Sequence, residues 1–139
     1  MFASLFSSKS PGIERDISAS EAMAALMVRI AKSDDDYSIT EIARIDAVLG
    51  LLYQLSADQA AKLRQTAEAL EAEAPDTVRF TRAIKEEVPY EERFDVVCAL
   101  WQVVLADGAR DAEEDALMRL LASLLGVNDR DSALARKQA

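Results

Sequence analysis

Two Asp-x6-Glu pairs, Asp34 with Glu41 and Asp107 with Glu114, are the residues whose type and spacing point to chemistry. In each pair the aspartate follows one apolar helical pattern, and the glutamate lies one turn into the next. Carboxylate oxygens that converge from a turn and from the following helix suit hard divalent cations. Because the ligands are all oxygens, Ca²⁺ or Mg²⁺ is favoured over Zn²⁺. The spacing is not that of an EF-hand, whose loop is longer.

The same acidic residues have a second interpretation that needs no metal. Ser38 with Glu41, and Asp111 with Glu114, have the spacing of a capping box, in which both residues bond the first turn of a helix. Such a cap stabilises a helix start by about 1 kcal/mol. Two carboxylates about 5 Å apart repel by roughly 3 kcal/mol at an effective dielectric constant near 20, so converging acids need a cation or a nearby base. The sequence leaves caps and cation ligands open, and the two roles are compatible.

Helices are the elements that must position these acids. The chain has 139 residues, half of them apolar, with only four Gly and three Pro. Ala, Leu, Glu and Arg dominate, and all are good helix formers. Three Ser residues stand three positions before a Glu or Gln, and each predicts a helix start: Ser18, Ser38 and Ser56. The sequence predicts an all-α bundle of about seven helices, with a tail over residues 1–17 and one domain over residues 18–139.

Apolar spacing predicts which helix faces are buried. One face of the first helix is marked by Met23, Leu26, Met27 and Ile30. The helix after the second acidic turn is expected to bury Leu117, Leu120, Leu121, Leu124 and Leu125. Gly126 is typical of the left-handed residue that follows a helix. In the short helix near residue 80, either Val78 or Phe80 faces the core.

An internal repeat organises the chain. Residues 26–52 align with residues 99–125 without a gap, so that both acidic pairs superimpose. Each half is predicted to form a helix, an acidic turn and a capped helix, over about residues 20–55 and 91–126. Two such hairpins, each apolar on one face, are expected to pack about an approximate two-fold axis.

Composition excludes several classes of function. The net charge of −9 argues against nucleic acid and anionic lipid as partners. There is no His and only one Cys, Cys98, so the usual general base and the usual zinc ligands are missing. No signal peptide and no membrane-spanning stretch is recognisable, which favours a cytoplasmic protein that is not inserted in a membrane.

Other side chains are assigned to the core or the surface. Trp101 is expected in the core, with its indole N–H bonded to a carbonyl or a carboxylate. Cys98 is interpreted as a buried small hydrophobe rather than a reactive thiol. A solvated helix face is the simplest role for three glutamates, Glu68, Glu71 and Glu73.

The second half of the chain carries an ordered string of motifs: Arg79-Phe80-Thr81, Glu92-Arg93, Leu100-Trp101, Ala106-Asp107-Gly108, Glu113-Glu114 and Leu124-Leu125-Gly126-Val127. This string resembles the TerB-like tellurite-resistance family, and the resemblance extends over nearly the whole chain beyond the N-terminal tail. It implies an all-helical, bacterial, cytosolic domain with a duplicated hairpin. It also implies acidic turns that chelate a divalent metal, a link to tellurite resistance and stress systems, and membrane or other partners.

By this resemblance the acidic motif positions are Asp34, Glu41, Asp107 and Glu114. The chain departs from the family pattern in both turns. Ala109 and Arg110 stand where another acid and a small apolar residue are usual, and Asp35 replaces the Gly of the first turn. These departures weaken the second turn as a cation site and enrich the first.

The function that we expect is a non-enzymatic, acidic module that binds a divalent cation and a protein partner in stress or metal response, with no organic cofactor. The main alternative is a protein-interaction or scaffold domain whose turns are capped and metal-free. A metal-dependent hydrolase is a further alternative, but the sequence has no nucleophile motif and no Gly-rich phosphate loop. The metal, the partner and the oligomeric state are left open.

Overall fold

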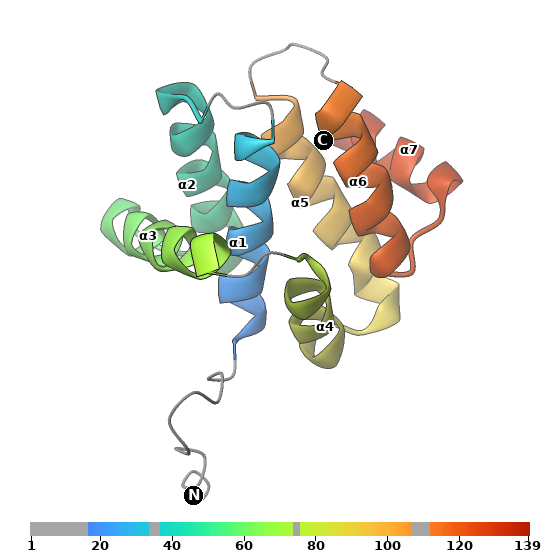
Figure 1. Cartoon of the computed structure of the whole chain (residues 1–139), viewed down its shortest axis with the longest axis horizontal. Helices are drawn as coiled ribbons and strands as arrows, with labels where there is room; N and C mark the ends of the chain where they lie inside the picture. Colours follow the sequence, from blue (N-terminus) through green and yellow to red (C-terminus); the bar gives the residue numbers. More distant parts are fainter. Residues whose placement is uncertain (1–16, 34–36, 74–75, 107–111) are drawn as a thin grey trace, which may run out of the picture.

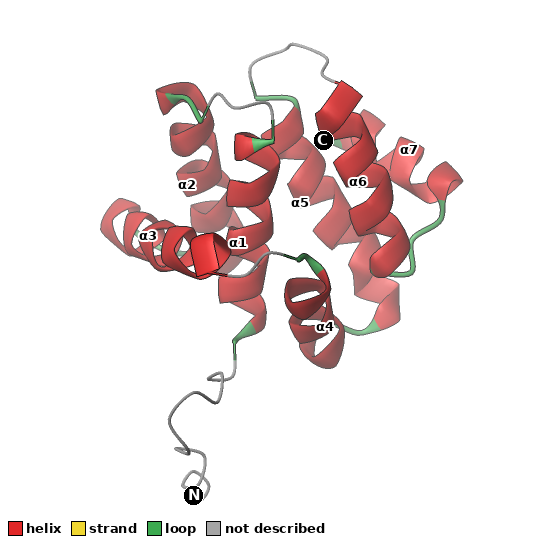
Figure 2. Ribbon diagram, in the orientation of Figure 1, coloured by secondary structure: helices red, strands yellow, loops and turns green. Residues whose placement is uncertain are grey.

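The fold consists of helices and connecting loops (Figures 1 and 2). The computed structural model describes residues 17–33, 37–73, 76–106 and 112–139, and contains no strand in these ranges. The all-α prediction of about seven helices is therefore confirmed. The helices are α1 (Ala19–Lys32), α2 (Ile39–Tyr53), α3 (Ala57–Glu73), α4 (Val78–Glu87), the 3-10 helix η1 (Tyr90–Glu92), α5 (Arg93–Val104), α6 (Ala112–Leu124) and α7 (Asp129–Gln138). No helix in the described part of the chain is long and apolar enough to cross a membrane.

The three predicted helix starts are confirmed by their hydrogen bonds. In α1 and α2 the Ser18 and Ser38 hydroxyls accept from the backbone N–H three residues on, and a glutamate accepts from the Ser N–H. Ser56 and Gln59 make the same reciprocal pair, with N–O distances of 2.9 and 3.1 Å. Each cap satisfies backbone N–H groups that have no partner within the helix.

Helix α1 is the centre of the molecule. It contacts α2, α3, α4, α5 and α6, and Figure 1 shows it between α2 and α3 on one side and α5 and α6 on the other. Its residues are buried almost all round, from Ala22 through Val28 without interruption. The sequence predicts only one buried face, because Ala24, Ala25 and Val28 fall outside the spacing of the larger apolar residues. A helix enclosed on every side buries its small residues too.

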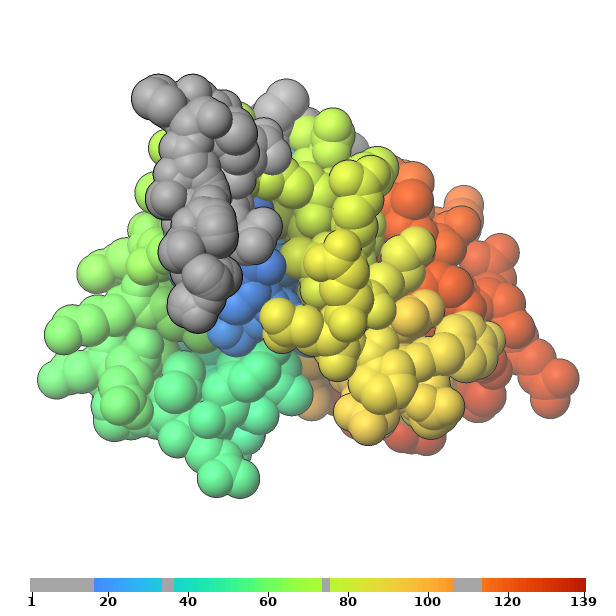
Figure 3. Space-filling view, turned by 90° about the horizontal axis from the view of Figure 1, so that it is seen from below, coloured from blue at the N-terminus to red at the C-terminus, as the bar shows by residue number. Residues whose placement is uncertain are grey.

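The remaining helices form two groups around α1. Helix α3 packs on α1 and α2, and α7 packs on α5 and α6. Seen from below, α4 and the adjoining η1 lie between the α2–α3 side and the α6–α7 side (Figure 3). Helices α2 and α6 begin at equivalent positions of the predicted repeat, Ile39 and Ala112. The two-fold axis itself stays a prediction.

The end of α6 follows the prediction from Gly126. This residue has φ +81°, and its N–H donates to the Ser123 carbonyl at 3.0 Å. The N–H of Val127 donates to the Ala122 carbonyl at 2.8 Å. These two bonds form a Schellman motif, which requires a left-handed residue at this point. After this turn the chain reverses direction, and α7 packs on α5.

The inward face of α6 differs from the prediction at one position. Met118, Leu121 and Leu125 are fully buried, whereas Leu120 is 49% exposed. The Leu-rich spacing marks a stripe that is wider than the surface available for packing. In α4 it is Phe80 rather than Val78 that faces the core, because Phe80 is fully buried and Val78 is 42% exposed.

Glu71 of α3 pairs with two basic residues of α1, so the prediction that Glu71 lies on a solvated helix face is wrong. Its two carboxylate oxygens accept from Arg29 Nε at 3.1 Å and from Lys32 Nζ at 2.9 Å. Glu68 is likewise paired, with Arg64 at 3.0 Å. Glu71 is paired because it lies beside the basic last turn of α1, whereas Arg64 and Glu68 are neighbours four residues apart within α3.

Because Glu71 is ion-paired in the fold, we expect the stability of the protein to depend on pH. Burial raises its pKa, but the bonds from Lys32 and Arg29 outweigh burial and hold the pKa below the usual value. A carboxyl whose pKa is lowered on folding stabilises the fold above its unfolded pKa of about 4.3, and this contribution is lost as the pH falls through the folded pKa. We therefore expect a decrease in the free energy of unfolding below about pH 4, measured by urea titration, that is smaller in Glu71→Gln.

The matched control for that pH profile is Glu73→Gln. Glu73 is an exposed carboxylate of the same helix, and it makes no ion pair with a described residue. We expect this variant to retain the wild-type decrease. Equal acid sensitivity of Glu71→Gln and wild type would show that the α1–α3 ion pair does not contribute to the stability of the fold.

Candidate functional site

Two of the four predicted metal ligands, Glu41 and Glu114, are buried carboxylates. Their side chains are 2% and 1% exposed. Each stands at the third residue of the helix that follows an acidic turn, Glu41 in α2 and Glu114 in α6. Glu41 Oε1 accepts hydrogen bonds from Ser38 N at 3.0 Å and from Ser38 Oγ at 3.3 Å. The predicted cap on α2 is thus present, and Glu41 is its acidic member.

The other two predicted ligands, Asp34 and Asp107, lie outside the described residues, as do Asp111 and Arg110. Within residues 17–33, 37–73, 76–106 and 112–139, no group of three or more Asp, Glu or Cys side chains is placed to hold a metal ion. The described acids therefore supply at most part of a cation site, and the convergence of the four predicted ligands stays a prediction.

The burial of Glu41 exceeds what its cap requires. Gln59 performs the same reciprocal capping for α3 while its side chain is exposed to solvent. A cap therefore does not by itself bury its third residue. Buried carboxylates need compensation from hydrogen bonds, ion pairs or a metal, because desolvation of a charge is costly. Glu41 and Glu114 are thus set apart from an ordinary surface cap.

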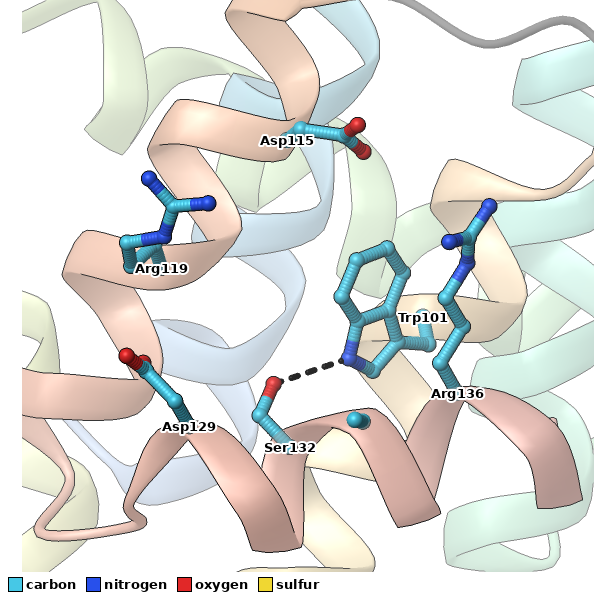
Figure 4. Close-up of a pocket in the computed structure, with 7 residues that line it drawn as sticks. Trp101, Asp115, Arg119, Asp129, Ser132 and Arg136 are labelled. Atoms are coloured by element: carbon cyan, nitrogen blue, oxygen red, sulfur yellow. Dashed lines mark hydrogen bonds between the residues drawn. The ribbon is translucent and has the colours of Figure 1, made fainter.

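A separate polar cleft of about 370 Å³ lies between α6 and α7. Trp101 of α5 forms its floor, and its walls carry Asp115 and Arg119 from α6 and Asp129, Ser132 and Arg136 from α7 (Figure 4). The Trp101 indole N–H donates to Ser132 Oγ at 3.1 Å. The Arg136 guanidinium lies over the indole ring, 5.2 Å from its centroid. The Trp101 core assignment is confirmed, but its partner is a hydroxyl rather than a carbonyl or carboxylate.

Sequence reasoning does not find this cleft. Its polar residues come from two helices, and their spacing of three or four residues within each helix is ordinary for any helix surface, so it does not mark a site. Ser132 in particular follows the acidic start of α7 and resembles an ordinary surface serine in sequence. The one local signal is Trp101, whose N–H needs a partner when buried.

Cys98 is a poor candidate for thiol chemistry. Its side chain is only half-buried, yet burial raises the pKa of the thiol, and the negative charge of Asp95 raises it further. The thiolate is the nucleophilic form, so a raised pKa lowers reactivity near neutral pH. The interpretation as a small packing residue is therefore favoured over a redox role.

Fold and sites together define a class of protein: an acidic all-α domain built around a central helix, with buried glutamates at the starts of two helices that follow acidic turns. The chain belongs to the tellurite resistance protein TerB family, since the model of that family matches residues 20–137, nearly the whole chain. The resemblance inferred from the motifs is thereby confirmed. A search of curated proteins and a search of solved structures each found no match.

Proposed function

We propose that this protein is a non-enzymatic, cytosolic module that binds a divalent cation through its acidic turns and acts with a protein partner in stress or metal response. The proposed ligands are Asp34 and Glu41 from the first turn and helix, and Asp107 and Glu114 from the second. The observation that carries the proposal is the burial of both glutamates, at 2% and 1% exposure, at equivalent helix positions.

The chemistry of the donor set fits a hard cation. Each pair offers carboxylate oxygens only, which suits Ca²⁺ or Mg²⁺ and gives Zn²⁺ no nitrogen or sulfur ligand. A cation would offset the cost of burying Glu41 and Glu114, and it would neutralise the repulsion among the aspartates that precede them in sequence. A bound cation would also link the start of α2 or α6 to the turn before it.

Cation binding is expected to stabilise the fold, and Glu-to-Gln variants separate it from capping. Gln at the third helix position keeps a capping box, as Gln59 demonstrates in α3. At a hundredfold excess over the dissociation constant, one bound cation adds about 2.7 kcal/mol to the free energy of unfolding. We expect Ca²⁺ or Mg²⁺ to give such a gain over EDTA in wild type, and the double variant Glu41→Gln/Glu114→Gln to lose it.

The matched control for this experiment is Glu21→Gln. Glu21 is the acidic member of the α1 capping box and is not among the proposed cation ligands. This variant is expected to respond to cation as wild type does. A wild-type protein that gains no stability from millimolar Ca²⁺, Mg²⁺ or Mn²⁺ would refute the cation proposal, as would a double variant that retains the full gain.

A pure protein-interaction domain is the second candidate function, and the surface of α2 favours it. Ile39 and Leu51 are 85% and 84% exposed, and Ala43 and Ala47 continue the exposed stripe at spacings of four residues. Beside the stripe, a mainly apolar groove of about 330 Å³ is lined by Gly50, Leu55 and Ala60 among others. Exposed aliphatic side chains in a row mark surfaces that bind other macromolecules.

A further inference from the structure

The groove beside α2 contains a glycine that the fold of one chain does not require. The groove lies between the second half of α2 and the start of α3, and Gly50 is part of its lining. Gly50 has no positive φ. Among the described residues, an added Cβ would meet only the Leu55 carbonyl oxygen, at 3.4 Å. Glycine inside a helix weakens it relative to alanine, and its common use is to let another group approach the backbone closely.

Ile39, at the other end of α2, has the shape and polarity to fill such a groove. Its side chain is 85% exposed, more than any other large apolar side chain in the part of the chain that the structure describes. Ile39 and Gly50 are eleven residues apart, which is about three helical turns, so both face the same side of α2. Figure 1 shows α2 at the edge of the molecule, beside α3. One exposed helix face thus carries both an apolar projection and an apolar groove.

A two-fold axis brings the projection of one copy to the groove of another. If two α2 helices pack antiparallel, with the axis level with residue 45, Ile39 of each copy lies beside Leu51 of the other, at the groove. The same pairing places Ala43 against Ala47, and these small side chains allow the two helices to approach closely. An interface about a two-fold axis must be complementary to itself, and this face meets that requirement.

The charges on α2 allow two acidic copies to meet there. The chain carries a net charge of −9, so two copies repel wherever their acidic surfaces face each other. Helix α2 is described over its whole length, and none of its exposed residues is acidic. Asp46, at the edge of the groove, is paired with Arg64 Nε at 2.7 Å. Arg44 stands beside the apolar face, where its long side chain can keep the charge in water. A basic partner would gain little from such a surface.

We propose that this face of α2 is the interface of a homodimer, in which Ile39 of each copy enters the groove beside Gly50 of the other. The inference deepens the interaction function favoured by the α2 surface and rests on it, and it does not depend on cation binding. Glu41 is 2% exposed and so lies away from this face. Stable interfaces bury about 800 Å² on each partner, which exceeds one helix face and its groove, so we expect a weak dimer with a dissociation constant of about 100 µM.

Sedimentation velocity of the full chain at about 10 to 500 µM measures the dimer, over the range in which a dimer of this affinity forms. Ala47→Glu places carboxylates at the helix crossing and is expected to weaken dimerisation at least about tenfold, as is Ile39→Ser, which removes the projection. Gly50→Ala is expected to weaken it several-fold without lowering thermal stability, because alanine is the better helix former. Ala69→Glu is the matched control, since it adds the same charge at an exposed alanine of α3 outside the groove.

An equimolar mixture of Ala43→Lys and Ala47→Glu tests the antiparallel pairing. We expect the mixture to dimerise while each variant alone stays monomeric, because the opposite charges meet across the interface. A wild-type chain that stays monomeric at about 500 µM overturns the proposal, whether the N-terminal residues or a different protein then cover the face. Ala47→Glu that dimerises like Ala69→Glu also overturns it. The gain in stability from Ca²⁺ or Mg²⁺ is measured on the same wild-type samples, so failure of the dimer and failure of cation binding are distinguishable.

Discussion

Phe80→Ala is expected to lower the free energy of unfolding by about 3–5 kcal/mol, the range for truncating a fully buried Phe. Phe80 is fully buried and lies where α4 meets α1. The Arg29 guanidinium sits over its ring at 5.7 Å from the centroid, and the same guanidinium pairs with Glu71 of α3. The ring therefore supports three helices at once, and its loss leaves a cavity that a short helix such as α4 cannot close.

Val78→Ala is the control for Phe80→Ala. It lies two residues earlier in the same helix, and Val78 is 42% exposed. Surface substitutions of this kind change stability by no more than about 0.5 kcal/mol. Urea unfolding followed by circular dichroism measures both. A cost for Val78→Ala that equals the cost for Phe80→Ala would mean that α4 is rotated from the orientation described above.

Trp101→Ala is the second substitution with a large expected effect, again about 3–5 kcal/mol. The indole is 7% exposed and packs between α5 and α7, with Arg136 on its face. Its loss removes packing, the bond to Ser132 and the platform for Arg136 together. Because α7 contacts mainly α5 and α6, we expect the C-terminal helix to be destabilised most.

The Trp101–Ser132 bond is separated from the packing by combining Trp101→Phe with Ser132→Ala. Trp101→Phe keeps an aromatic ring but loses the indole N–H together with the packing of the second ring, so the Ser132 hydroxyl, 6% exposed, is left without its donor. An unsatisfied buried polar group costs about 1–3 kcal/mol. Combining Trp101→Phe with Ser132→Ala should recover part of that cost, which a double-mutant cycle measures by circular dichroism. Strictly additive costs would contradict the Trp101–Ser132 bond.

The capping role of Glu41, one of the candidate cation ligands, could be predicted from the sequence for a physical reason. Ser38 and Glu41 are three residues apart, and their reciprocal bonds form within one turn of helix, so no distant part of the chain is needed. Their roles as cap members follow from the sequence alone. The burial of Glu41 and Glu114 does not follow from it, because burial depends on which other helices cover the start of α2 and α6.

The sequence by itself determined the helical class, the helix starts at Ser18, Ser38 and Ser56, the left-handed end at Gly126 and the family. All of these depend on contacts within a few residues or on ordered motifs. The tertiary structure decided which faces are covered: it encloses α1 on all sides and leaves Ile39 and Leu51 in solvent. It also brought Trp101 to Ser132 and set the arginines around them. These outcomes depend on pairs of residues far apart in the chain, whose meeting is governed by the packing of whole helices rather than by local spacing.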